Sequence, residues 1–190
     1  IEFYNGSTKK MTSLQDYDFL NRTVSVDSEI ESSGKHIGFG YQYNLASQRT
    51  QVSREDGSHW KYGYDSLGQV ISGQRYWSDG TRVIGQQFGY DYDDIGNRIH
   101  SYAGGDVNGS NMRVTGYTHN DVNEMTVRDL SGYVEIQGIA PLSSVVSVNS
   151  QLADRQGEYY REELSVSTTS AAAYTNVTVS GTGLTSSAGK

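Results

Sequence analysis

Residues 64–71 read YDSLGQVI, and residues 92–99 read YDDIGNRI. The two stretches are copies of one motif, with a tyrosine, an aspartate, and a glycine four places after the tyrosine. Residues 43–50 (YNLASQRT) and 17–24 (YDFLNRTV) are looser copies, and residues 119–126 (HNDVNEMT) keep the spacing without the tyrosine. The copies start at 17, 43, 64, 92 and 119, at intervals of 26, 21, 28 and 27 residues. A period in this range indicates a repeat protein with one supersecondary unit per repeat.

The residues before each motif indicate that the repeating unit is a β-hairpin. Phe39, Tyr41 and Tyr43 lie at alternate positions, and residues 60–64 and 88–92 repeat this aromatic pattern. Because side chains in a strand alternate between faces, each hairpin presents three rings on one side. Rings on neighbouring strands can then pair across the sheet. We therefore predict an all-β chain in which a series of antiparallel β-hairpins forms an open sheet.

The motif itself predicts a tight turn. The aspartate or asparagine after the tyrosine can bind the backbone two residues on, and glycine, asparagine or serine suits a residue at positive φ. Asp-Gly pairs at 56–57 and 79–80 predict turns at the other ends of the strands. The residues that we expect to shape the repeats are Tyr17, Asp18, Tyr43, Asn44, Tyr64, Asp65, Gly68, Tyr92, Asp93 and Gly96.

The composition excludes several classes of protein. The 190 residues include 22 glycines, 21 aromatic residues (15 Tyr, 4 Phe and 2 Trp) and no cysteine, so disulfides and thiol chemistry are ruled out. The net charge of −7 gives no basic face, so nucleic acid is not an expected partner. No apolar stretch approaches the roughly 18 residues of a membrane span. The chain begins at Ile1 without methionine, and we expect it to be a fragment of a larger protein.

After residue 129 the tyrosine motif stops, and the composition shifts to Val, Ser, Thr and Ala. Strand-like runs at 133–139, 145–149, 158–166 and 174–180 predict a small β-sandwich-like domain. The predicted organisation is a repeat region at 1–129, a sandwich-like domain at 130–182 and a flexible tail at 183–190.

The motif resembles the YD repeats of Rhs-family proteins, which are related to toxin-complex C components and teneurins. The resemblance covers residues 1–129 and implies that the hairpins wind side by side into a spiral sheet, as the wall of a shell or barrel. It also implies a secreted or cell-surface location in bacteria. Five hairpins would form only an arc with two open edges, so the expected partners are the remaining repeats of the parent protein or another copy of the chain. The aspartate-based self-cleaving segment and the effector that end Rhs shells are not recognisable here.

The sequence offers little catalytic or metal-binding chemistry. Asp91, Asp93 and Asp94 resemble the start of a calcium loop, but Ile95 occupies a ligand position and Tyr102 replaces the closing glutamate. A self-capped turn is therefore favoured over a cation site. No histidine has a second ligand at metal spacing, and no nucleophile motif is present. We expect neither a cofactor nor enzyme activity.

Rows of aromatic residues can also stack against sugar rings. Trp60, Tyr62, Tyr76 and Trp77 are the first candidates for such contacts. Packing between hairpins is the favoured role, because the repeat itself requires these rings. The sequence thus predicts a non-enzymatic structural fragment, with a carbohydrate-binding module as the alternative.

Overall fold

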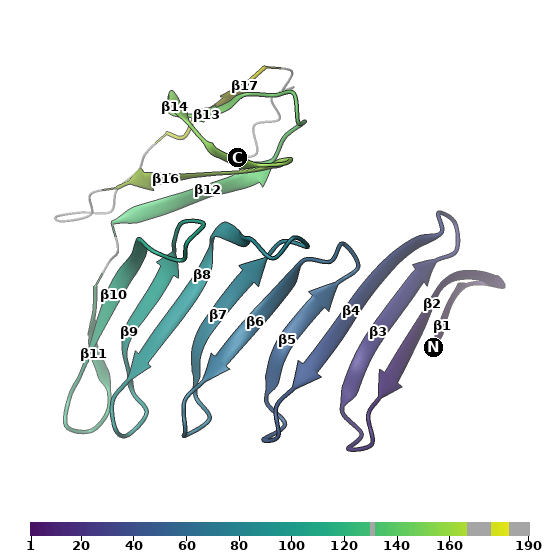
Figure 1. Ribbon diagram of the computed structural model, residues 1–190, viewed down its shortest axis with the longest axis horizontal. Coiled ribbons are helices and arrows are strands. Elements are labelled where there is room, and N and C mark those ends of the chain that lie inside the picture. The colour runs from purple at the N-terminus through teal and green to yellow at the C-terminus, as the bar shows by residue number, and fades with distance from the viewer. Residues whose placement is uncertain (130–131, 167–175, 183–190) are drawn as a thin grey trace. The chain divides into compact units, whose positions relative to one another are not determined.

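The computed structural model describes residues 1–129, 132–166 and 176–182 (Figure 1). Contacts divide the chain into two compact units, Ile1–Met112 and Arg113–Lys190. Regular structure in the described residues is entirely β, as predicted. Across the same residues, no helix is long and apolar enough to span a lipid bilayer.

The first eleven strands form one open sheet whose strand order follows the chain from β1 to β11. Successive strands are joined by short turns that alternate between the two ends of the strands (Figure 1). This meander confirms the predicted open sheet of antiparallel hairpins. The strands are β1 (Glu2–Asn5), β2 (Thr8–Tyr17), β3 (Thr23–Ile30), β4 (Lys35–Tyr43), β5 (Arg49–Arg54), β6 (His59–Tyr64), β7 (Val70–Tyr76), β8 (Arg82–Tyr92), β9 (Arg98–Gly104), β10 (Met112–His119) and β11 (Met125–Arg128).

One face of the sheet in the first unit is aromatic. Tyr41 lies opposite Val52, and Val52 lies opposite Trp60. Gly73 of β7 lies between Tyr62 and Phe88 in register. Because Gly73 has no side chain, Trp60 and Phe88 reach across β7 and stack with ring centroids 5.9 Å apart. The three-ring stripes of neighbouring hairpins therefore meet across the sheet.

The other face is polar. A row that runs across five strands consists of residues opposite one another in register, namely Gln42, Gln51, Lys61, Gln74 and Gln87. Gln87 is fully buried and donates to the Val83 carbonyl at 3.1 Å. Alternation along these strands places the row on the face opposite Tyr41, Trp60 and Phe88.

A bulge marks every motif. The pairing register shifts at the motif tyrosine, which then lies opposite the first residue after the turn. The histidine of the fifth copy does the same. An extra residue in one strand increases local twist and fixes the direction of the side chains beside it. The pairs are Tyr17↔Thr23, Tyr43↔Arg49, Tyr64↔Val70, Tyr92↔Arg98 and His119↔Met125.

The C-terminal residues form two three-stranded sheets, ordered β12-β16-β15 and β14-β13-β17. Val146 and Val148 of β13 are fully buried with Ala140 and Ala153, and Leu164 of β16 packs against them. This shared core gives the sandwich-like arrangement that was predicted. The strands are β12 (Tyr133–Ile139), β13 (Val146–Val148), β14 (Gln151–Leu152), β15 (Asp154–Gln156), β16 (Tyr159–Ser165) and β17 (Val179–Gly181).

The predicted strand at 174–180 is wrong in part. Residues 174–175 lie outside the described residues, residues 176–178 are not strand, and β17 begins at Val179. Its partner β13 ends at Val148, because Asn149 and Ser150 both have positive φ, 47° and 67°. The alternating Val and Thr residues before β17 therefore have no further residues of β13 with which to pair. The short strands β14 and β15 were not predicted, and the expected tail at 183–190 lies outside the described residues.

Candidate functional site: the repeat turns and the aromatic face

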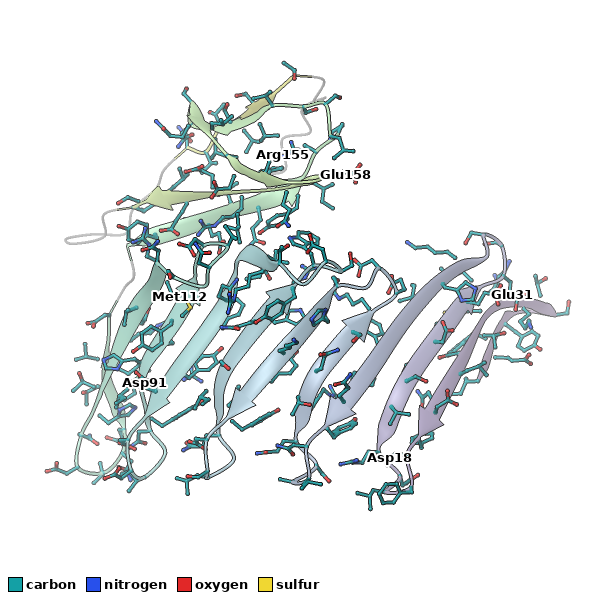
Figure 2. All side chains as sticks on the ribbon, viewed as in Figure 1. Asp18, Glu31, Asp91, Met112, Arg155 and Glu158 are labelled. Carbon is teal, nitrogen blue, oxygen red and sulfur yellow. The ribbon has the colours of Figure 1, made fainter. Side chains whose placement is uncertain are left out.

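Each motif folds into a turn around its aspartate or asparagine. The Asp65 Oδ1 accepts hydrogen bonds from the backbone N–H groups of Leu67 and Gln69, at 2.9 and 2.8 Å. The Asp65 N–H donates to the Gln69 carbonyl, which closes the turn. The corresponding residues of the other copies make the same pair of side-chain bonds, and they are Asp18 (Figure 2), Asn44, Asp93 and Asn120.

The second oxygen or nitrogen of this side chain bonds the side chain four residues later. Asp65 Oδ2 accepts from Gln69 Nε2 at 3.0 Å, whereas Asn120 Nδ2 donates to Glu124 Oε2 at 2.9 Å. The copy with aspartate therefore has a donor four residues later, and the copy with asparagine has an acceptor there. The same complementarity holds for Asp18 with Arg22, Asn44 with Gln48, and Asp93 with Asn97.

The residue four places after the motif tyrosine has positive φ in every copy. Gly68 and Gly96 have φ values of 86° and 91°. Asn21, Ser47 and Asn123, which replace glycine in the looser copies, have values of 60°, 59° and 66°. The looser copies therefore use the same backbone turn.

The hydroxyl of the motif tyrosine binds the preceding repeat. Tyr64 Oη donates to the Arg49 carbonyl at 2.7 Å, at the exit of the previous turn. Tyr43 and Tyr92 donate in the same way to the carbonyls of Thr23 and Val70, at 2.7 and 3.0 Å. We call this contact the tyrosine clamp. Three successive clamps join four repeats, and sequence inspection assigned the tyrosines to the repeats without finding this partner.

Tyr17 is the exception among the motif tyrosines. Its hydroxyl donates to the Gln15 side chain of its own strand at 2.7 Å, and its side chain is 52% exposed. Strand β1, which pairs with the first part of β2, does not extend to Tyr17. Among the described residues no strand pairs with β2 at Tyr17, and its hydroxyl makes no clamp.

Side chains of one turn also bond the next turn. Arg22 Nη1 donates to the Asn44 carbonyl at 3.3 Å and to Ser47 Oγ at 3.2 Å. Gln48 Nε2 donates to the Gly68 carbonyl at 3.2 Å. The turns are thus connected along their edge of the sheet as well as through the tyrosines.

Arginines lie over several of the tyrosine rings. The Arg22 guanidinium lies 4.7 Å from the centre of the Tyr43 ring, and Arg49 lies 4.2 Å from that of Tyr41. Arg98 covers Tyr90 at 4.9 Å. These cation–π contacts add to the packing of the aromatic face and occupy ring surface that a ligand would need.

Sequence inspection missed one turn of the same kind. Asp106 Oδ1 accepts from the N–H groups of Asn108 and Ser110 at 2.8 and 3.0 Å, and Gly109 has a φ of 78°. The spacing Asp-x-x-Gly at 106–109 carried the signal, but no tyrosine precedes it. The predicted turns at 56–57 and 79–80 are present, with Gly57 and Gly80 at positive φ.

The turn hydrogen bonds lower the pKa values of several aspartates. Backbone donation from Ser110 lowers the pKa of Asp106, and backbone donation from Arg22 lowers that of Asp18. At Asp93, burial acts to raise the pKa, but the hydrogen bonds from Asn97 and the turn outweigh it and the net shift is downward. The turns therefore favour ionised carboxylates.

The four aromatic candidates for sugar contact do not form one surface. Trp60 and Tyr62 stack on the aromatic face, with planes 6° apart and centroids separated by 6.4 Å. Tyr76 lies opposite His59 in register and stacks on it at 5.3 Å, whereas Trp77 begins the turn at 77–81 beneath the Arg75 guanidinium. Because β7 ends at Tyr76, Trp77 belongs to the turn and not to the strand face that Tyr76 shares with His59. Burial raises the pKa of the Tyr62 hydroxyl.

A hollow of about 560 Å³ is lined by the turns at 65–69 and 93–97 and by Tyr90, Asp91 and His100. Three of the carboxylates that line the hollow already accept hydrogen bonds within the protein. Asp65 and Asp93 cap their own turns, and Asp91 (Figure 2) accepts from Tyr102 Oη at 2.6 Å and lies 3.3 Å from His100 Nδ1. In the part of the chain that the structure describes, no three His, Asp or Glu residues gather as metal ligands would.

No family model and no curated protein matches the sequence. Solved structures match in fold. The TcdB2-TccC3-Cdc42 crystal structure aligns with 90% of this chain at a TM-score of 0.52 and 14% identity. The TcdB2-TccC3-TEV crystal structure aligns with 68% at 0.50 and 16% identity. The Tc holotoxin pore of Photorhabdus luminescens aligns with 71% at 0.51 and 15% identity.

This chain covers only 8%, 6% and 6% of those three chains, respectively. It therefore corresponds to a small part of each. At these identities the likeness is one of fold, and it relates the sheet in a general way to the Tc toxin and Rhs architectures.

Proposed function

We propose that this chain is a non-enzymatic structural segment of a large, secreted or cell-surface YD-repeat protein of bacteria, in which it contributes wall to a β-shell or stalk. The tyrosine clamp is the observation that carries the proposal. The motif tyrosines Tyr43, Tyr64 and Tyr92 each join their hairpin to the one before it. A tyrosine hydroxyl bound in this way stiffens the sheet and is not free to donate to a substrate.

The turns support the same function. Their aspartates accept hydrogen bonds from their own backbone, and the side chains four residues later reach the next turn. The likeness to Tc toxin chains is compatible with a wall segment, because this chain covers only a few per cent of them. Spiral winding of the sheet is part of the proposal.

Cryo-electron microscopy of the full-length protein that carries this sequence tests the proposal. We expect the strands β1–β11 to lie within a larger continuous sheet that encloses a space or extends as a stalk. A separate domain, with both ends of its sheet uncovered and the aromatic face open to solvent, would contradict a wall.

Carbohydrate binding is the second candidate. Trp60 and Tyr62 favour it, because their parallel rings lie on one face and are only half-buried. A glycan array provides the test, with Trp60→Ala as the binding variant and Tyr76→Ala, on the other face, as the matched control. Saturable binding that Trp60→Ala abolishes and Tyr76→Ala keeps would favour a binding module over a purely structural one.

A further inference from the structure

Strand β12 is an outer strand of its three-stranded sheet, and among the described strands it pairs with β16 alone (Figure 1). Its seven residues, YVEIQGI, include no proline, lysine or arginine. Its register with β16 is continuous, without a bulge. Natural sheets usually protect an outer strand with proline, lysine, a bulge or a short length. Strand β12 has none of these features, and it lies within the chain, between β11 and β13.

The other outer strands of the C-terminal sheets are short. Strand β14 has two residues, and β15 and β17 have three each. Strand β15 also carries Asp154 and Arg155, and charged side chains discourage pairing with a further strand. Among the described strands of these two sheets, β12 is therefore the one with a long, uncharged backbone edge apart from Glu135.

Hydrogen bonds just beyond the ends of the β12–β16 pairing show which backbone groups of β12 point outward. The Ala140 N–H donates to the Glu158 carbonyl at 2.8 Å. The Val166 N–H donates to the Gly132 carbonyl at 2.7 Å, and both pairs continue the β12–β16 register. Because directly bonded pairs alternate along an antiparallel ladder, the even-numbered residues of β12 bond β16, and the odd-numbered residues point their N–H and C=O groups away from it. The outward groups belong to Tyr133, Glu135, Gln137 and Ile139.

We propose that β12 of one copy of the chain pairs antiparallel with β12 of a second copy, about a two-fold axis at Ile136. This register sets the outward groups of the two strands against each other. Tyr133 then lies opposite Ile139, and Glu135 lies opposite Gln137. All seven residues of the strand are paired, and the two three-stranded sheets join into one continuous sheet.

The side chains on the outward-bonding positions fit this register. Tyr133 and Ile139, which are 38% and 77% exposed, form an apolar pair at each end of the contact. Glu135 meets the uncharged Gln137. A two-fold axis at Glu135 would instead oppose two carboxylates, which is destabilising. An axis at Gln137 would pair fewer residues, so the axis at Ile136 is favoured.

The intervening residues fit as well. Val134, which is 42% exposed, lies opposite Gly138 in this register. The Tyr160 ring occupies the space that a side chain on Gly138 would take. Val134 of one copy therefore meets Tyr160 of the other, and the two Ile136 side chains meet at the axis. The contact adds apolar packing to the backbone hydrogen bonds.

Sedimentation velocity of the full chain, over a hundredfold range of concentration around about 10 µM, tests the pairing. We expect a monomer–dimer equilibrium. The contact joins the same surface of both copies, so it closes on itself and adds no third copy.

Two substitutions at Gln137 test the register by the sign of their effects. Gln137→Glu sets like charges opposite Glu135 at two symmetric positions, so the dissociation constant of the dimer should rise by about threefold to tenfold. Glutamate keeps the oxygen that accepts from Tyr159 Oη. Gln137→Lys sets opposite charges there, and the dissociation constant should fall by about the same factor. With an axis at Gln137, lysine would face lysine and weaken the dimer.

Gln151→Glu and Gln151→Lys are the matched controls, because they change the net charge equally at an exposed residue of β14. Both should dimerise as the native chain does, and circular dichroism establishes that each variant is folded. A native chain that stays monomeric, a Gln137→Glu effect no larger than that of Gln151→Glu, or weaker dimerisation of Gln137→Lys would overturn the proposal. The pairing does not rest on the proposed wall function, and none of these results affects the imaging test of the wall.

Discussion

At the scale of single residues, the repeat depends on one polar side chain that organises each turn. Asp65 accepts two backbone hydrogen bonds and one from Gln69, so removing its carboxylate leaves three donors without their acceptor. Asparagine does the same in the turn of Asn44, where the amide donates to Gln48 instead. The turn therefore requires an oxygen at Oδ1 and not a charge.

Asp65→Ala should lower the free energy of unfolding by about 1 to 3 kcal/mol, the usual cost of removing a charged acceptor from several donors. Asp65→Asn should be nearly neutral, because Gln69 can turn its amide as Gln48 does. Urea denaturation followed by tyrosine and tryptophan fluorescence measures both variants. Equal losses for alanine and asparagine would show that charge, and not turn geometry, is what matters.

The lowered pKa values of Asp18, Asp93 and Asp106 predict a dependence of stability on pH. A carboxylate with a lower pKa in the folded state favours folding above its unfolded pKa, near ~3.9. That contribution is lost as the pH falls through the folded pKa. We expect the urea midpoint to decrease below about pH 4.5.

Asp106→Asn should make this decrease shallower, because it removes one of the contributing groups and keeps the Oδ1 acceptor. The exposed Asp94 provides the control, and Asp94→Asn should leave the pH profile unchanged. A midpoint that is constant between pH 7 and pH 3 would contradict ionised turn carboxylates as a source of stability.

At the scale of the elements, each hairpin combines a backbone turn of fixed handedness with a bulge that directs the motif tyrosine. Gly68 is at a φ of 86°, whereas the equivalent Asn21 and Asn123 tolerate 60° and 66°. Asparagine reaches this region more easily than other side chains because it can bond its own backbone. The repeat thus uses glycine, asparagine or serine at this one position.

Gly68→Val should cost about 1 to 2 kcal/mol of unfolding free energy, since a β-branched residue is strained at positive φ. Gly68→Asn should cost less, because asparagine reaches positive φ more easily, while the added carbon displaces the end of the Gln48 side chain equally in both variants. Gly40→Ala is the control: its backbone has an ordinary φ, and its added carbon would meet Ser53 at an ordinary 3.9 Å. Thermal unfolding compares the three variants, and a Gly68→Val variant as stable as Gly68→Asn would contradict the strain.

Much of this element-level structure could be predicted from the sequence. The motif period, the aromatic alternation and the Asp-Gly pairs were sufficient to predict the hairpins and turns. The turn at Asp106 was missed because no tyrosine precedes it. Tyr76 and Trp77 were both named as candidates for sugar contact, but Tyr76 stacks on His59 whereas Trp77 begins the next turn.

The tyrosine clamp could not be predicted, because its acceptor depends on the bulge and on the pairing register between hairpins. Tyr64 and Arg49 are 15 residues apart, whereas Tyr92 and Val70 are 22 apart, so no fixed spacing reveals the contact. The limited length of β17 also depends on its partner, β13, and not on its own alternation.

In the C-terminal sheets a single arginine holds a loop. The Arg155 guanidinium (Figure 2) donates to the carbonyls of Ser144, Ala140, Pro141 and Gly157, at 2.9 to 3.1 Å. Arg155→Met should therefore destabilise this unit by about 2 kcal/mol, and Arg155→Lys by less, because an ammonium retains part of the donation. Denaturant unfolding of the full chain measures both, and a neutral Arg155→Met would exclude this role.

At the scale of the whole molecule, the sheet is a row of hairpins that each hold the one before. Repeat proteins gain their stability from such nearest-neighbour contacts as well as from each repeat. A low aliphatic content is then compatible with a stable sheet, because hydroxyls and guanidiniums contribute to the junctions between hairpins in addition to buried rings. Damage at one clamp should weaken the neighbouring repeat.

Hydrogen exchange of Tyr64→Phe tests this most directly. The variant keeps the ring and removes only the hydroxyl that binds the Arg49 carbonyl. We predict faster exchange in the preceding hairpin, over residues 39–54, as well as around residue 64. Tyr17→Phe, whose hydroxyl bonds only its own strand, should exchange like the native chain. If Tyr64→Phe exchanges like the native chain, or if Tyr17→Phe is affected equally, the clamp does not hold the repeats together.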